Sequence, residues 1–187
     1  MPKNISTLQR KENRKMKILV FSDSHGSAFN MQKAVNMHPD AEYILHLGDG
    51  VEDLRYIKHS IPNVIAVSGN HEDFTPFQDK QPPTRVLEIA GKRIFMCHGH
   101  KQKVRLGLQN LYYTANEENA DIALYGHTHI KRNDYTPLAE SPDQTRSGVY
   151  FFNPGSISQP RDDFYSSFGL IDIQPNGVLL SHGLITK

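Results

Sequence analysis

The chain has 187 residues, which suits one domain of ordinary size. Its 21 Lys and Arg residues nearly balance its 20 Asp and Glu residues, and a net charge of +1 predicts no general attraction to nucleic acid or anionic membranes. The single cysteine, Cys97, excludes an intramolecular disulfide. No apolar run approaches the roughly 20 residues of a membrane span. We therefore expect a cytoplasmic protein with no membrane association and no stable nucleic-acid binding.

The first 15 residues differ from the rest of the chain because they are polar and show no apolar periodicity. They include basic residues, but the apolar stretch of a secretory signal does not follow. We expect a disordered tail over 1–15 and a single domain over 16–187. The methionine at position 16 is an alternative start of the chain.

Apolar strand-length runs alternate with helical patterns through the first two thirds of the chain. The predicted strands are 17–21, 43–47, 63–67, 85–90, 93–97 and 121–125, and the predicted helices are 27–37, 51–58 and 104–118. The last third is β-rich, with strands over 149–152, 164–173 and 178–184. Strand–helix–strand alternation favours a parallel α/β sheet.

Five of the predicted strands end in polar, glycine-containing turns. The turns are Asp23-Ser-His25, Gly48-Asp49, Gly69-Asn70-His71, His98-Gly-His100 and Gly126-His127-Thr-His129. Successive turns are 21 to 29 residues apart, about the length of a strand, a crossover and a return strand. Because the carboxyl ends of parallel strands lie at one edge of a sheet, we expect these turns to meet there.

The side chains of these turns are imidazoles, carboxylates and an amide, which are ligands for transition metals such as Mn, Fe, Co, Ni and Zn. Seven such ligands are too many for one tetrahedral ion but suit two divalent ions that share one carboxylate. Two such ions and two aspartates leave a net positive site, which attracts an oxyanion. A pair of ions can clamp a phosphoryl group and activate a water molecule to attack it. We expect manganese first, with Zn, Fe, Ni or Co as alternatives.

The same turns, together with a later Asn153-Pro-Gly-Ser156, resemble the motifs of the calcineurin-like metallophosphoesterases. Their order and the size of the chain are most similar to the small prokaryotic phosphodiesterases of the YfcE type. The resemblance covers roughly residues 17–184. It implies an α/β fold, a four-layer α/β/β/α sandwich of two mixed β-sheets flanked by helices.

The resemblance also implies a role for each site residue. The metal ligands would be Asp23, His25 and His129 for the first ion, Asp49 as the bridge, and Asn70, His98 and His127 for the second ion. His71 would be catalytic, protonating the leaving oxygen or stabilising the transition state, and would bind substrate together with Asn70. His100 would lie near the first ion or the phosphate. Many YfcE-type members carry Cys-Asp where His71-Glu72 stands, which leaves the substrate preference open.

Other polar residues have simpler interpretations. We expect His46, on a predicted strand, to be a hydrogen-bonded core histidine, and Cys97 to pack in the core. His38, His59 and His182 are expected at the surface. The Asn153–Ser156 segment is either a plain turn or a wall of the site. We expect the stretches 72–83 and 131–147 to shape the pocket.

The sequence thus predicts a dinuclear metal-dependent phosphoesterase, first of all a phosphodiesterase, acting on a small-molecule phosphate ester. A phosphomonoesterase or nucleotide phosphatase of the same superfamily is an alternative. A further alternative is a non-catalytic scaffold like the retromer subunit that shares this fold. Exposed edge strands would also permit a homo-oligomer.

Overall fold

The computed structural model describes residues 15–59, 61–72, 81–138 and 146–186. In chain order the elements are β1 (Met16–Phe21), α2 (Ala28–Met37), β2 (Tyr43–His46), the 3-10 helix η1 (Val51–Tyr56), β3 (Asn63–Ala66), β4 (Thr84–Ile89), β5 (Lys92–Cys97), α3 (Gln109–Glu117), β6 (Ile122–Leu124), β7 (Lys131–Pro137), β8 (Gly148–Pro154), β9 (Ser166–Gln174) and β10 (Gly177–Ile185). Except for Lys15, the expected tail 1–15 lies outside the described residues, as does most of the expected loop 72–83.

The first sheet has the strand order β10-β9-β1-β2-β3. Its β1, β2 and β3 run parallel, and β9 and β10 form an antiparallel hairpin beside β1. The apolar run predicted over 17–21 lies in β1, where Ile18, Leu19, Val20 and Phe21 are fully buried. Burial on both faces is typical of parallel strands, which helices cover.

The second sheet has the strand order β4-β5-β6-β8-β7. Its central strands β5, β6 and β8 run parallel, and β4 and β7 are antiparallel edge strands. The hairpin predicted between 85–90 and 93–97 is confirmed, because β4 and β5 pair Ile89 with Lys92. Each sheet therefore contains a parallel group of three strands and is mixed overall.

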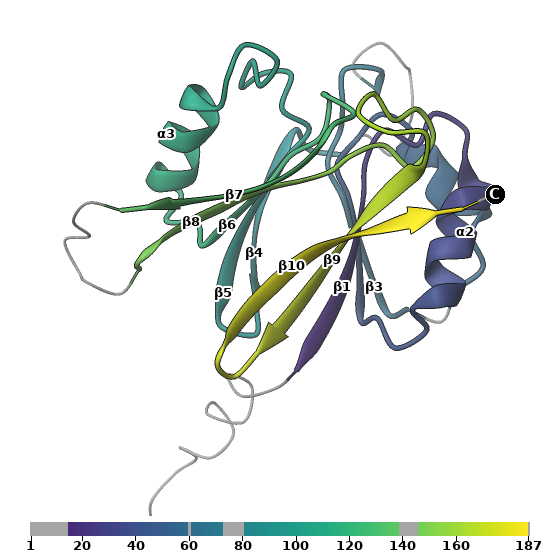
Figure 1. Ribbon diagram of the computed structural model, residues 1–187, viewed down its shortest axis with the longest axis horizontal. Coiled ribbons are helices and arrows are strands. Elements are labelled where there is room, and N and C mark those ends of the chain that lie inside the picture. The colour runs from purple at the N-terminus through teal and green to yellow at the C-terminus, as the bar shows by residue number, and fades with distance from the viewer. Residues whose placement is uncertain (1–14, 60, 73–80, 139–145, 187) are drawn as a thin grey trace, which may run out of the picture.

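The two sheets pack face to face and helices cover their outer faces (Figure 1). On one side α2 and η1 pack on the first sheet, where Met31 and Ala34 join Leu19 and Phe21 in one buried cluster. On the other side α3 packs on the second sheet through a cluster that contains Leu111. The predicted four-layer α/β/β/α sandwich is confirmed.

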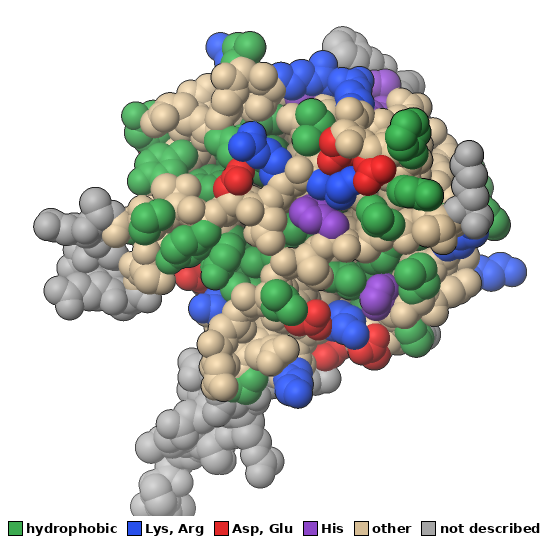
Figure 2. Space-filling model, viewed as in Figure 1, with side chains coloured by type: hydrophobic (Ala, Val, Ile, Leu, Met, Phe, Trp, Pro, Cys, Tyr) green, Lys and Arg blue, Asp and Glu red, His purple; other side chains and the backbone are tan. Residues whose placement is uncertain are grey.

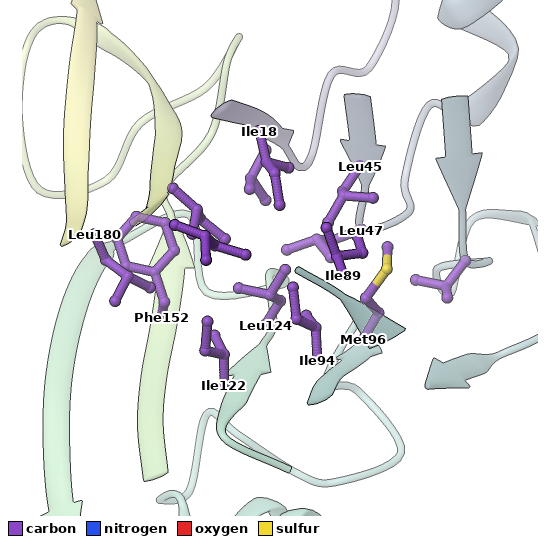
Figure 3. Close-up of a cluster of buried hydrophobic side chains, with 14 residues drawn as sticks. Ile18, Leu45, Leu47, Ile89, Ile94, Met96, Ile122, Leu124, Phe152 and Leu180 are labelled. Carbon is purple, nitrogen blue, oxygen red and sulfur yellow. The ribbon is translucent and has the colours of Figure 1, made fainter. Parts of the chain in front are cut away.

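The largest core lies between the sheets (Figure 3). Ile18, Leu45 and Leu47 come from the first sheet and the turn after it, and they face Ile94 and Leu124 of the second sheet. Burying such aliphatic side chains contributes roughly 1.5–3 kcal/mol each to stability. This core fixes the two parallel groups against each other, and so fixes where their carboxyl ends lie.

The structure adds the strand β7 in the stretch 131–147, for which the sequence predicted no secondary structure. Its sequence, KRNDYTP, is polar, and every residue in it is half-buried or exposed. An edge strand of this kind carries no apolar alternation, so periodicity could not identify it.

Two predicted helices are shorter than expected. The helix predicted over 104–118 begins only at Gln109, because Gly107 has a φ of 139° that a helix cannot continue. The helix predicted over 51–58 is the six-residue 3-10 helix η1. Within the described ranges, no helix has both the length and the apolar character needed to cross a membrane.

Candidate metal centre

The five polar turns meet at one end of the sandwich, but they do not come from one sheet as expected. The turns after β1, β2 and β3 belong to the first sheet, and those after β5 and β6 belong to the second. Backbone contacts join neighbouring turns within each sheet, from Asp23 N to Gly48 O at 3.0 Å and from Gly126 N to His98 O at 2.9 Å. Between the sheets, His127 N donates to Asp23 Oδ2 at 3.0 Å. Periodicity identifies strands but not the sheet to which each belongs, which is why the prediction was wrong on this point.

The backbone of these turns is unusual. Five predicted ligands have a left-handed backbone: Asp23, His25, Asp49, His127 and His129, with φ between 41° and 66°. Among the described residues only three other non-glycine positions have positive φ. Such conformations cost of order 1 kcal/mol or more each and cluster at functional sites. Here they turn the side chains out of the strand direction and toward a common point.

The first candidate group consists of Asp23, His25 and His129, whose ligand atoms all lie within 4.8 Å of one another. His129 Nδ1 lies 2.7 Å from Gln159 O, so it carries the proton and its Nε2 faces Asp23 Oδ1 at 3.2 Å. Burial alone would raise the pKa of Asp23, but the hydrogen bond with His129 and the charge of His98 outweigh it and lower the pKa. Asp23 is therefore an ionised, buried carboxylate.

The second candidate group consists of Asp49, His98 and His127, again within 4.8 Å. His98 Nδ1 lies 2.8 Å from Leu47 O and donates to it, so Nε2 is the ring atom that faces the other side chains of the group. That nitrogen lies 3.3 Å from Asp49 Oδ2, 3.1 Å from Asn70 Oδ1 and 3.2 Å from His127 Nδ1. Four ligand-type atoms from four turns thus converge on one place.

Charge favours an ionised carboxylate in this group and a neutral imidazole at His127. Burial would lower the pKa of His98, but its hydrogen bond with Asp49 and the charge of Asp23 raise it in the absence of a metal. Burial lowers the pKa of His127 to about 4, and the nearby charges of His98 and Arg105 act in the same direction. Burial would raise the pKa of Asp49, but its hydrogen bond with His98 and the charge of that histidine lower it instead. A neutral histidine and an ionised aspartate are the forms that bind metal.

His71 occupies a different position from the other histidines because its side chain is 63% exposed. Its Nε2 lies 3.8 Å from Asp49 Oδ2, and its ring lies 4.8 Å from that of His25. His25, Asp49 and His71 form a third group within 4.8 Å, so Asp49 links this rim to the buried ligands. His71 N anchors the residue by donating to Asp49 Oδ1 at 2.9 Å.

His100 lies beside the second group. Its ring is 5.4 Å from that of His98 and 6.1 Å from that of His127. The residue between the two histidines, Gly99, has a left-handed φ of 106°.

Other residues hold the site turns in place. Asn153 Nδ2 donates to Gly126 O at 2.9 Å, and Ser156 Oγ donates to Asp23 O at 2.8 Å, so the Asn153–Ser156 segment is more than a plain turn. His46 is fully buried as expected, between Ser24 Oγ and Gly48 N, each at 3.1 Å. Burial lowers the pKa of His46 to about 4.

Of the residues with simpler interpretations, Cys97 packs in the core at 1% exposure, as predicted. The expectation for His182 was wrong: it is half-buried, with Nε2 2.8 Å from Asn153 O and its ring stacked on Phe152 at 4.7 Å. His38 is also half-buried, whereas His59 is exposed. Sequence reasoning gave no role to Glu72, whose carboxylate accepts hydrogen bonds from four backbone N–H groups.

The donor set fits divalent transition-metal ions. Carboxylates and imidazoles are the donors such ions take. His98 and His129 each donate the second ring N–H to a backbone carbonyl, the arrangement that orients metal-binding histidines. Along the upper edge of the molecule, where the turns gather in Figure 1, His side chains lie next to Lys and Arg (Figure 2). The rim therefore suits an anionic substrate.

Comparison with known proteins identifies the family and the fold. Residues 16–176 match the family profile described as calcineurin-like phosphoesterase superfamily domain. The chain is 30% identical over 182 residues to phosphodiesterase YfcE of Escherichia coli K12, covering 84% of this chain and 88% of that protein.

Solved structures are similar over nearly the whole chain. A predicted phosphoesterase from Streptococcus pneumoniae TIGR4 has a TM-score of 0.64 at 26% identity, covering 92% of this chain and 99% of that one. Wild-type Vps29 from Entamoeba histolytica, solved in complex with Zn²⁺, has a TM-score of 0.59 at 22% identity, covering 90% and 99%. The second of these similarities concerns the fold alone.

Proposed function

The chain belongs to the calcineurin-like phosphoesterase superfamily, and we propose that it hydrolyses phosphodiesters of small molecules at a centre of two divalent metal ions. The observation that carries the proposal is the convergence of two ligand groups, one around Asp23 and one around His98, with Asp49 beside both. The relative named as a phosphodiesterase supports the choice of a diester.

Each predicted ligand has a place in this proposal. Asp23, His25 and His129 would hold one ion, and His98 and His127 would hold the other. Asn70 belongs with the second set because its Oδ1 lies 3.1 Å from His98 Nε2, and Asp49 would bridge the two ions. When bound, the ions lower the pKa of a water molecule and neutralise charge on the phosphoryl oxygens.

The side chains of the protein orient the reaction. The buried, ionised Asp23 and Asp49 fix the negative charge of the site, and the histidines add none while they are neutral. His71 stands at the exposed rim, where it can reach the leaving oxygen of an ester and donate the Nε2 proton to it. His100 borders the site where the phosphate would lie.

The identity of the ions is the second part of the proposal. Mixed carboxylate and imidazole donors suit manganese, and zinc, iron, nickel and cobalt suit them too. The zinc complex of the structurally similar Vps29 supports a test with zinc beside manganese. We propose manganese as the native metal of a cytoplasmic enzyme.

A scaffold without activity is the second candidate, because Vps29 shares this fold. The presence of all seven predicted ligands favours the enzyme. Within the superfamily, a phosphomonoesterase or nucleotide phosphatase differs from a diesterase only in the ester it accepts. His71-Glu72, where many YfcE-type members have Cys-Asp, keeps that question open.

The test is hydrolysis of bis-p-nitrophenyl phosphate with Mn²⁺, with and without a chelator. The proposal expects turnover that depends on the metal and is lost on chelation. A parallel panel of monoesters, diesters, cyclic nucleotides and dinucleoside polyphosphates then defines the ester class. If no ester in the panel is hydrolysed with Mn²⁺ or Zn²⁺, the scaffold candidate replaces the enzyme.

A further inference from the structure

The carboxylate of Glu72 lies between two of the site turns, and both of its oxygens accept hydrogen bonds from backbone N–H groups. Its Oε1 accepts from Gly50 N at 2.6 Å and from Val51 N at 3.1 Å. Its Oε2 accepts from Asp49 N at 2.9 Å and from Gly69 N at 2.6 Å. Each oxygen thus accepts two hydrogen bonds, which uses the lone-pair positions that a metal would need.

Three of the four donors, the N–H groups of Asp49, Gly50 and Val51, are consecutive and follow β2. The backbone that aims them is left-handed. Gly48, Asp49 and Gly50 all have left-handed backbones, with φ of 95°, 57° and 116°. Successive N–H groups in such a turn point into one concavity and form an anion-binding nest. Here the anion is part of the chain itself, the carboxylate of Glu72.

The fourth donor, Gly69 N, belongs to the next turn, so the carboxylate joins the two turns. They approach so closely that a Cβ on Gly48 would lie 2.4 Å from Gly69 N, and a Cβ on Gly69 would lie 2.1 Å from Asp49 Oδ1. The first turn carries Asp49 and the second carries Asn70 and His71. Their separation decides whether the Asp49 and Asn70 oxygens both reach His98 Nε2, at 3.3 and 3.1 Å.

We propose that Glu72 is a positioning residue: its carboxylate fills the nest of the Asp49 turn, ties that turn to the Asn70 turn, and so sets the geometry of the second ion. The proposal rests on the proposed function only in naming that ion. Glu72 itself is not a ligand, because both of its oxygens are occupied by N–H groups and it is in none of the ligand groups.

The first test compares Mn²⁺ affinity by equilibrium dialysis for the wild type and Glu72→Gln, which keeps the shape but loses the charge. We expect affinity for one of the two Mn²⁺ equivalents to fall by about 10–100-fold, the usual cost of removing a group that orients ligands. The matched control is Glu117→Gln, the same change at an exposed site on α3, and it leaves affinity unchanged. Glu72→Asp keeps the charge and restores part of the loss. Wild-type affinity in Glu72→Gln would overturn the proposal.

The second test needs neither metal nor activity. Amide hydrogen exchange by NMR on the metal-free wild type should show protected N–H groups at Asp49, Gly50, Val51 and Gly69. Glu72→Gln should lose that protection and Glu72→Asp should keep part of it, while the β1 amides keep theirs in both variants. Rapid exchange of the four amides in the wild type contradicts the proposal, even if the variants do not fold. An inactive wild type whose four amides are protected contradicts the proposed function alone.

Discussion

The turns of the two sheets bring different chemistry to the same site. The first sheet supplies all the oxygen donors, from Asp23, Asp49 and Asn70, together with one imidazole, His25. The second sheet supplies imidazoles only, from His98, His127 and His129. The carboxylate half and the imidazole half of the candidate centre thus come from different layers of the sandwich.

The two halves also differ in how their backbones are held. In the first sheet, the backbone carbonyls of the Asp49 turn accept hydrogen bonds from Asp23 N and His25 N. Three N–H groups of the same turn donate hydrogen bonds to the Glu72 carboxylate. In the second sheet the turns are joined by Gly126 N to His98 O. The first sheet thus presents an anionic frame held by backbone hydrogen bonds, and under the proposed function a cation would attach the imidazoles of the second sheet to it.

The largest effect is expected at Asp49, the carboxylate shared by both halves. Asp49→Asn should weaken both ions and lower kcat/KM by about 10³-fold or more, since several kcal/mol of transition-state stabilisation depend on the metal. Hydrolysis of bis-p-nitrophenyl phosphate at saturating and limiting Mn²⁺ measures this.

The control for that variant is Asp40→Asn, the same change at a surface carboxylate paired with Lys17, which should keep wild-type kinetics. Metal-dependent turnover in Asp49→Asn close to that of the wild type would count decisively against a shared carboxylate.

The next largest effect is expected at His71, and it tests whether this residue at the rim is a proton donor or a metal ligand. His71→Ala should lower kcat by about 10²–10⁴-fold, the usual range for a general acid, while both ions remain bound. Steady-state kinetics together with a Mn²⁺ binding titration measure the two quantities. Loss of an ion in this variant would show that His71 is a ligand.

A pH effect of up to about 3 kcal/mol is expected from the buried His46 of the first sheet. Its folded pKa of about 4 lies below the unfolded value of 6.5. Between these values the unfolded chain binds more protons, so the free energy of unfolding falls as pH drops from 6.5 toward 4.

Urea unfolding of the metal-free protein at pH 7 and pH 5 measures this effect. His46→Asn keeps an acceptor for Gly48 N but cannot titrate. That variant should therefore lose less stability between the two pH values than the wild type does. An equal loss in both proteins would mean that His46 does not contribute.

The smallest effect concerns the increase in the free energy of unfolding when Mn²⁺ is added to the metal-free protein. At 100 times the dissociation constant, Mn²⁺ should raise the free energy of unfolding by about 2.7 kcal/mol. His127→Ala, in the second sheet, should reduce that gain, and the control His59→Ala, at an exposed histidine, should not. If Mn²⁺ stabilised His127→Ala as much as the wild type, His127 would not take part in metal binding.

Much of this architecture could be predicted because its signals are local. The apolar run 17–21 and the five polar turns are contiguous patterns, and the turns place seven ligand-type residues at strand ends. The four-layer fold came from the resemblance that those turns carry, not from periodicity. Hydrophobic patterns do not reveal strand pairing, so the residues alone suggested one sheet where there are two.

Other features depend on contacts that no local pattern records. Within the described ranges the polar edge strand β7 pairs with β8 alone, and it has no apolar alternation. The role of Glu72 depends on the left-handed φ values of Gly48, Asp49 and Gly50, which together form the nest. His182 is covered because its ring stacks on Phe152 of another sheet.

The most direct measurement is anomalous diffraction at the manganese edge from crystals grown with Mn²⁺. The account predicts two peaks, one among Asp23, His25 and His129 and one among Asp49, Asn70, His98 and His127, with Asp49 contacting both. Peaks elsewhere in the molecule, or no peak between the two sheets, would contradict it.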